Sequence, residues 1–262
     1  MDIIIDFFAQ HQAILQLAAF VMLAGFIDSI AGGGGLISLP AYIATGMPIH
    51  AALGSNKFSS TFGLSFSVLV FVRNKRVYLR PIALSIVCAL IGSALGARLA
   101  LLVSDEIFRR MLMVAVPIVA IFVLMKKDFG SKNEISTLSP HTIMIGSAIA
   151  SLIIGTYDGF FGPGTGSFLI FAFTAFLKFD LVTASGNAKI INLSSNIGSV
   201  TMFLITGQVW FAYAIPAAIA GILGNILGSH LAIKIGARII RPVFIIVLAI
   251  LLFTISPFGG SL

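Results

Sequence analysis

Four charged side chains stand deep within long apolar stretches of the sequence. They are two aspartates, Asp28 and Asp158, and two lysines, Lys57 and Lys189. A charged residue at the centre of a membrane helix costs about 2.5–3.5 kcal/mol on insertion scales, so it must face an opposite charge or a polar cavity. Lysines at such a depth can bind an anion, and carboxylates can balance the lysines or carry a proton. The four residues therefore predict an anion site inside a membrane protein.

Two other interpretations of the lysines stay open at this point. Lys57 stands six residues into its apolar stretch, or about 9 Å along a helix that rises 1.5 Å per residue. Its long side chain could therefore reach the membrane interface. Alternatively, each half of the chain could form a purely structural ion pair of its own, Lys57 with Asp28 and Lys189 with Asp158.

The composition places the chain in a membrane. Of its 262 residues, 58% are hydrophobic and 10% are charged, whereas a soluble domain has about 45–50% apolar and about 25% charged residues. This excludes an ordinary cytosolic enzyme, a disordered chain and a nucleic-acid-binding domain, despite the net charge of +7. A single cysteine, Cys88, and four scattered histidines offer no ligand spacing for a metal. We expect no metal, no cofactor and no enzymatic activity.

The apolar stretches predict about 8–10 membrane segments in an all-helical protein. Six stretches have the length of a full crossing, which is about 20 residues: 51–72, 81–103, 107–125, 181–206, 212–233 and 239–256. Two other regions are interrupted by glycine. Residues 13–30 run into Gly32 to Gly35 and resume at 36–44, and residues 142–157 run into the glycine cluster 162–166 and resume at 167–177. We predict that both form hairpins of short or broken helices.

The two halves of the chain repeat each other. An offset of 130 residues aligns Asp28 with Asp158, and after a two-residue insertion an offset of 132 aligns Lys57 with Lys189. Common membrane residues such as Gly and Leu match by chance, but paired Asp and Lys do not. We therefore predict a first transmembrane repeat at 1–125, a cytoplasmic linker at 126–141 and a second repeat at 142–262. The Gly-x-x-x-Gly spacings at 92–96 and 224–228 are typical of close contacts between helices.

The basic residues predict how the repeats are oriented. The loop at 73–80 holds four basic residues and no acid, while its counterpart at 207–211 is uncharged. The segment at 234–241 is basic, while its counterpart at 104–110 mixes both signs. Because basic loops stay in the cytoplasm, equivalent loops lie on opposite sides of the bilayer. This predicts two repeats of inverted topology, as in many secondary transporters, with both termini outside.

The glycine clusters and polar helix faces supply further candidate ligands. Where a short helix follows a break, several N–H groups and the positive end of the helix dipole point at one place, which suits an anion. Serines and asparagines near each lysine can donate hydrogen bonds to the oxygens of such an anion. Polar helix faces of this kind can also form hydrogen bonds between helices. The candidate substrate-binding residues are Gly33, Gly34, Ser55, Asn56, Lys57, Ser59, Gly164, Thr165, Asn187, Lys189 and Asn192.

These motifs carry a resemblance to a known family. The segments Asp28-Ser-Ile-Ala-Gly-Gly-Gly-Gly-Leu-Ile-Ser-Leu-Pro40 and 52–57, with 158–166 and 184–189 in the second half, resemble the TauE/SafE family of anion permeases over 15–256. The resemblance implies transport of sulfur-containing anions, sulfite or organosulfonates, across the bacterial inner membrane, with proton coupling as an option. Asp28 and Asp158 are the candidates for ion pairing or proton coupling.

The sequence thus predicts a multi-pass secondary transporter of a small anion, with the lipid bilayer as its other partner and no nucleic acid. An uncoupled anion channel is the alternative, and saturation of the flux at low substrate concentration would favour the transporter. A purely structural membrane protein does not account for the paired charges. A monomer and a homodimer are both compatible with the sequence.

Overall fold

The computed structural model describes residues 2–108, 110–111 and 137–236. In these residues there is no strand, and the predicted all-helical class is confirmed for them. The helices are α1 (Asp2–Ala31), α2 (Gly35–Ala44), α3 (Ile49–Arg73), α4 (Leu79–Ala100), α6 (Pro140–Phe160), α7 (Thr165–Ala175), α8 (Leu181–Ile205) and α9 (Phe211–Ile235).

Most of the predicted crossings correspond to long helices. Within the described residues, five segments are long and apolar enough to cross a membrane: His11–Ala31, Ile82–Ala100, Pro140–Phe160, Leu181–Ile205 and Phe211–Ile235. Helix α3 is as long as α8 but more polar over its first half, so it does not meet the same criterion. Nearly all of the predicted segment 107–125, the whole of 239–256 and most of the linker 126–141 lie outside the described residues.

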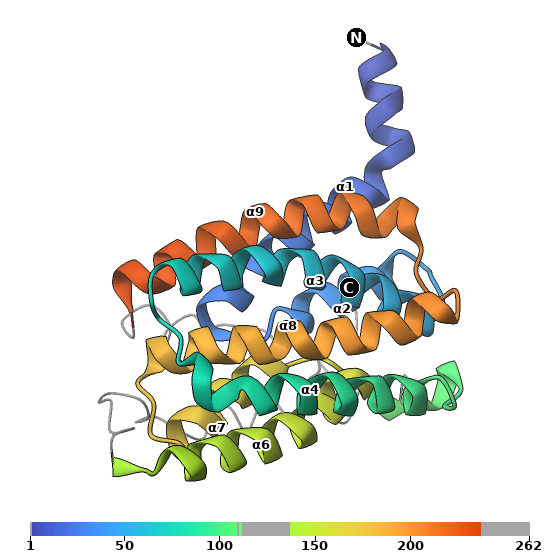
Figure 1. Cartoon of the computed structure of the whole chain (residues 1–262). Coiled ribbons are helices and arrows are strands. Elements are labelled where there is room, and N and C mark those ends of the chain that lie inside the picture. Colours follow the sequence, from blue (N-terminus) through green and yellow to red (C-terminus); the bar gives the residue numbers. More distant parts are fainter. Residues whose placement is uncertain (1, 109, 112–136, 237–262) are drawn as a thin grey trace.

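The helices interlock rather than form two separate bundles. Helices α3 and α8 lie at the centre, with α9 and α1 on one side and α4 and α6 on the other (Figure 1). Helix α9, from the second half, packs on α1 and α3, and α4, from the first half, packs on α6 and α8. The first turns of α1 extend beyond this bundle (Figure 1).

The outer faces of the peripheral helices are apolar. On α9, Ile215, Ile219, Leu223 and Leu227 recur every four residues, and all four are about half exposed or more. Residues at this spacing share one face of a helix, so they form a continuous apolar stripe. Such an exposed stripe suits lipid chains, whereas most of the serine, asparagine and lysine side chains of α3 and α8 are buried in the centre.

Both predicted glycine breaks are present, each between a long helix and a short one. Helix α1 ends at Ala31, and the backbone turns through Gly33 with φ of 98° before α2 begins. Helix α6 ends at Phe160, and Gly164 takes φ of 82° at the N-cap of α7. Residues other than glycine rarely adopt positive φ, which explains why glycine clusters mark both turns. Helices α2 and α7 are shorter than a full crossing.

The predicted glycine contacts between helices are confirmed. A Cβ atom on Gly92 of α4 would lie 2.6 Å from the carbonyl oxygen of Leu152 on α6. A Cβ atom on Gly224 of α9 would lie 2.9 Å from the amide nitrogen of Phe26 on α1. The two backbones therefore approach too closely for any side chain, and the same arrangement occurs once on each side of the bundle.

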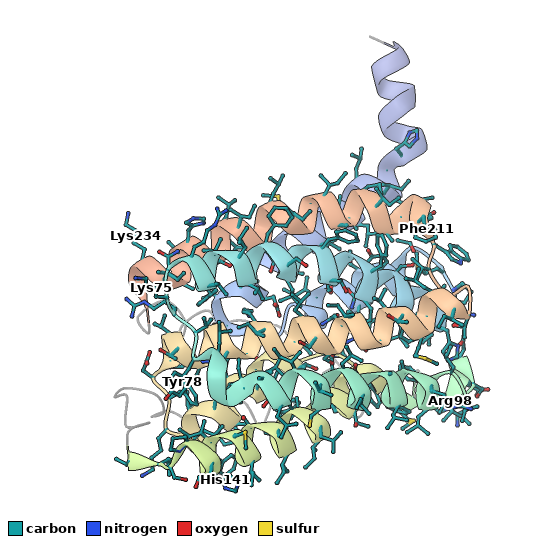
Figure 2. The ribbon with its side chains drawn as sticks, viewed as in Figure 1. Lys75, Tyr78, Arg98, His141, Phe211 and Lys234 are labelled. Atoms are coloured by element: carbon teal, nitrogen blue, oxygen red, sulfur yellow. The ribbon has the colours of Figure 1, made fainter. Side chains whose placement is uncertain are left out.

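The basic loops gather at one end of the bundle. Lys75, Tyr78 and Lys234 lie at one end, and Arg98 and Phe211 lie at the other (Figure 2). The ring of Phe179, in the loop before α8, contacts the ring of Tyr78 with centroids 6.2 Å apart. The loop that follows α3, the loop that precedes α8 and the C-terminal end of α9 therefore share one end.

We expect the glycine crossings to be sensitive to a single methyl group. Gly96→Ala and Gly228→Ala place a Cβ against backbone carbonyls of Thr156 and Phe26, which cannot move aside, so each should cost about 1–3 kcal/mol of stability. Thermal unfolding in detergent measures the effect. Gly146→Ala is the matched control, because its Cβ would meet only the flexible end of a leucine side chain. Equal effects of all three substitutions would contradict this packing.

Candidate functional site

A small cavity lies where the two glycine breaks face the central helices α3 and α8. Water can occupy about 50 Å³ of it, whereas one water molecule needs roughly 10–15 Å³. It can therefore hold a few waters or one small ion. Polar, glycine and charged residues dominate its wall: Gly25, Asp28, Gly33, Gly34, Gly35, Ser38, Asn56, Lys57, Ser59, Ser60, Asp158, Gly162, Gly164, Thr165, Gly166, Asn192, Asn196, Gly221 and Asn225, with Val21, Ala24 and Leu64.

The two breaks touch each other beside this cavity. A Cβ atom on Gly166 would lie 2.9 Å from the Cα atom of Gly32. The Ser167 hydroxyl donates a hydrogen bond of 3.1 Å to the carbonyl oxygen of Ala31. Because α2 and α7 both start here, their first N–H groups and positive dipole ends lie close to the same space. Unwound backbone is tolerated at membrane depth only where protein or water covers it, and each break covers the other.

Lys57 forms a tight buried ion pair with Asp158. The Lys57 ammonium lies 2.6 Å from Oδ2 of Asp158, and both side chains are less than 5% exposed. The same carboxylate oxygen accepts a hydrogen bond of 2.5 Å from the hydroxyl of Ser195 on α8. Lys57 lines the cavity, and no other lysine or arginine among the described residues does so.

Lys189 is placed differently from Lys57. Its ammonium donates to the backbone carbonyl oxygen of Asp28, and it lies 3.4 Å from Oδ2 of the Asp28 carboxylate. The other carboxylate oxygen of Asp28 accepts a hydrogen bond of 3.1 Å from the N–H of Gly34, at the N-cap of α2. Lys189 is completely buried and does not line the cavity, whereas the Asp28 side chain is 14% exposed and does.

Both ion pairs join one half of the chain to the other. The interpretation of a structural pair within each half is therefore wrong, because Lys57 bonds Asp158 and Lys189 bonds Asp28. The interpretation that the lysines extend to the interface is also wrong, since both ammonium groups are buried against carboxylates. The repeat did not reveal this exchange, because the offsets place an aspartate and a lysine in each half.

Several amide side chains complete the wall. Asn196 donates to Oδ1 of Asn192 at 3.0 Å, and Oδ1 of Asn225 accepts a bond of 2.7 Å from Ser29. The side-chain oxygen of Asn56 is buried and has no hydrogen-bond partner among the described residues. A buried polar group without a partner is costly, so Asn56 is free to bind a molecule in the cavity.

Most of the predicted site residues line the cavity, and three do not. Ser55 accepts a hydrogen bond of 2.9 Å from the N–H of Trp210, and Asn187 accepts one of 3.0 Å from the N–H of Tyr78. Both side chains hold loops at the ends of the bundle, and Lys189 is enclosed behind Asp28. The candidates that the structure brings to the cavity are Asp28, Gly33, Gly34, Asn56, Lys57, Ser59, Asp158, Gly164, Thr165 and Asn192.

Sequence reasoning missed some residues of the wall. Asn225 is the main omission, because it is a single asparagine within an apolar stretch and belongs to no motif. The sequence feature that could have identified Asn225 is the one that identified the buried charges, namely a polar side chain within an apolar stretch of membrane-spanning length. Asn196 is a second omission, although it lies two helical turns after Lys189 on α8. Within the described residues, no group of three or more His, Cys, Asp and Glu side chains could bind a metal.

Comparison with known proteins identifies the family. The sequence profile of the family described as "Sulfite exporter TauE/SafE" matches residues 17–255. This chain belongs to the TauE/SafE family. It is a membrane transporter of that type, and no catalytic function is indicated.

Several TauE/SafE relatives match over nearly their whole length. A protein of Haemophilus influenzae named "Probable membrane transporter protein" is 38% identical over 94% of this chain and 93% of its own. The "Probable membrane transporter protein YfcA" of Escherichia coli K12 is 35% identical over 96% and 93%. The "Probable membrane transporter protein ORF9" of a Sinorhizobium species is 35% identical over 90% and 88%. No solved structure matches the chain.

Removing one partner of the ion pair between Lys189 and Asp28 should destabilise the fold strongly. Lys189→Met leaves the Asp28 carboxylate without its cation, which should lower the free energy of unfolding by about 3–5 kcal/mol. In Lys189→Met combined with Asp28→Asn, the loss should be smaller than the sum of the single losses, because both charges are gone. Unfolding in detergent measures the cycle.

The control for this cycle is Lys234→Met, which removes an exposed lysine from the end of α9. It should change the unfolding free energy little. Strictly additive losses in the double variant would show that Lys189 and Asp28 do not stabilise each other.

Proposed function

We propose that this protein is a secondary transporter that carries a small anion across the bacterial inner membrane, and that a sulfite or an organosulfonate is its substrate. The observation that carries the proposal is the Lys57 ammonium in the wall of the cavity beside the N-termini of α2 and α7. Two helix dipoles and one cation favour negative charge at the same place. The name of the family, which refers to sulfite export, supports the choice of a sulfur oxyanion.

The remaining wall suits the oxygens of such an anion. Asn56, Asn192 and Ser60 supply amide and hydroxyl groups around the lysine. A sulfonate or sulfite group has several acceptor oxygens on one atom, so it can accept from a lysine, an amide and backbone N–H groups together. The small volume favours a compact group over a bulky one. In the transport cycle, Asp28 and Asp158 are the candidates for carrying a proton.

We further propose that the two halves are repeats of inverted topology. The offset of 132 residues converts the contact of Ser55 with Trp210 into that of Asn187 with Tyr78. These two contacts lie at opposite ends of the bundle, since Tyr78 is at one end and the start of α9 is at the other (Figure 2). Because equivalent contacts of the two halves lie at opposite ends of the bundle, they support the inversion of one half relative to the other, as in many secondary transporters.

The turns at the two ends support the proposed orientation. Lys75 and Lys178 have φ of 55° and 58°, while the residues that the same offset pairs with them, Gly207 and Gly46, have φ of 70° and 82°. A residue with a side chain pays roughly 1–2 kcal/mol for this conformation. Lysine is present in these turns at the proposed cytoplasmic end, and glycine is present at the other end. The cytoplasmic end therefore carries positive charge despite the backbone strain of the two lysines, as the positive-inside rule expects.

We expect Lys57 to be required for anion binding. The purified protein should melt at a higher temperature with sulfite or 2-hydroxyethanesulfonate, because a ligand of the folded state stabilises it. Asn56→Ala removes one bond to a charged ligand and should weaken binding about tenfold or more. Lys57→Gln removes the cation and should weaken it further.

Lys234→Gln is the matched control, since it removes an exposed lysine outside the cavity. It should bind as the wild type does. Wild-type affinity in Lys57→Gln would contradict the proposed site, and stabilisation by carboxylates but not by sulfur anions would contradict the proposed substrate class.

We expect Lys75 and Lys234 to face the cytoplasm. In a Cys88→Ser background, single cysteines at these two positions should react with a membrane-impermeant maleimide from the cytoplasmic side, and Trp210→Cys should react from outside. Labelling of oriented vesicles measures this. Reaction of the two lysine replacements from opposite sides would contradict the orientation.

A further inference from the structure

We propose that Asp158, and not Asp28, is the carboxyl group that couples transport to protons: an anion in the cavity draws the Lys57 ammonium away from Asp158, and Asp158 takes up one proton in exchange. This inference rests on the proposed function and assigns its coupling residue. It follows from the unequal placement of the two ion pairs around the cavity.

The charges of the empty site cancel. Two lysines and two aspartates stand at this depth among the described residues, in two ion pairs. A monovalent anion that enters adds one uncompensated negative charge to an enclosed space. An unpaired charge in such surroundings is costly, and a carboxylate there is neutralised by protonation rather than left ionised. Uptake of one proton restores the balance of the occupied site.

The cation available to the anion belongs to Asp158. Lys57 lines the cavity and is already held by Asp158 at 2.6 Å, so an anion and Asp158 compete for one ammonium group. When the anion binds the Lys57 ammonium, the Asp158 carboxylate keeps the hydrogen bond from Ser195 as its remaining described contact. A buried carboxylate that loses its cation has lost most of what keeps it ionised.

Asp28 is protected from the same competition. Its cation, Lys189, does not line the cavity and is also bound to the backbone carbonyl of Asp28. The N–H of Gly34 donates to the carboxylate as well. An anion in the cavity therefore does not reach this ammonium, and Asp28 keeps both of its donors.

The other titratable groups around Asp158 do not replace it. Helix α7 contains none. On α4, the titratable side chains that the structure describes are Cys88 and Arg98, and Arg98 lies at the end of the bundle (Figure 2). Both ring nitrogens of His50 are engaged, one by Asp105 at 2.8 Å and the other by the carbonyl oxygen of Ala100 at 3.0 Å.

Two tyrosines complete the surroundings. Tyr157, on the same helix as Asp158, donates to the carbonyl oxygen of Pro163, and Tyr42 of α2 donates to Ser59. Both hydroxyl groups are thus held in neutral hydrogen bonds.

The proton step forms one O–H bond and breaks no bond between heavy atoms. A hydronium ion that reaches the cavity gives its proton to a carboxylate oxygen of Asp158, which itself lines the cavity, and becomes a water molecule. When the anion leaves, Lys57 returns to the carboxyl group and the proton is released. One monovalent anion and one proton then move together, and the cycle carries no net charge.

The experiment measures proton uptake during binding of 2-hydroxyethanesulfonate, whose sulfonate stays ionised across the neutral pH range. Calorimetry of the purified full-length protein in two buffers of different ionisation enthalpy gives the number of protons taken up per anion. We expect about one for the wild type, with Kd rising about tenfold per pH unit where Asp158 is ionised in the empty site. Asp158→Asn should take up none, and its Kd should not depend on pH.

Two further variants separate the carboxyl groups. Asp28→Asn combined with Lys189→Met removes the other ion pair without changing the net charge, and Asp158→Glu keeps the carboxyl group, so both should keep an uptake of about one proton. Uptake that is lost in the Asp28→Asn and Lys189→Met double variant, or kept in Asp158→Asn, would overturn the assignment to Asp158 and leave the proposed function intact. This holds even where Asp158→Asn does not fold, because the double variant alone can refute the assignment. Binding without proton uptake by the wild type would overturn the coupling, and absence of binding would overturn the proposed substrate class with it.

Discussion

A charge buried within a bilayer must find its opposite inside the protein, and in this chain each lysine finds it in the other half. Lys57 binds Asp158, and Lys189 binds Asp28. In this arrangement each half neutralises the buried charges of the other, so the two ion pairs tie the halves together. The central helices, α3 and α8, provide the lysines, and the hairpins on either side provide the aspartates. The interlocked packing of α4 and α9 on the opposite halves follows the same exchange.

The same constraint builds the cavity. Each aspartate lies a few residues before a glycine break, so pairing it with a lysine brings the break to the centre of the bundle. There the two breaks meet at Gly32 and Gly166, and their short helices begin at one place. Helix N-termini favour negative charge, and Lys57 adds a cation to the wall. An anion site thus arises from the features that allow the charges to be buried.

Sequence reasoning predicted the long helices, the broken hairpins and the close glycine crossings, because each has a local signature in apolar length, glycine clusters or spacing. Residue type also indicated the cavity wall. The partner of each lysine could not be predicted, since the repeat offers two equivalent pairings and only three-dimensional packing selects one. The difference between Lys57 and Lys189 was hidden for the same reason. Ser55 and Asn187 have the residue types of anion ligands, yet they do not line the cavity and instead accept hydrogen bonds from loop N–H groups.

The central claim is that the cavity beside Lys57 binds an oxyanion between the starts of α2 and α7. A crystal structure of the protein with selenite, a heavier analogue of sulfite, would test it most directly, because anomalous scattering locates selenium without ambiguity. The account predicts a selenium peak in the cavity, with an oxygen in contact with the Lys57 ammonium. A selenium peak only elsewhere in the protein, with Lys57 still bound to Asp158 and the cavity filled by water, would contradict it.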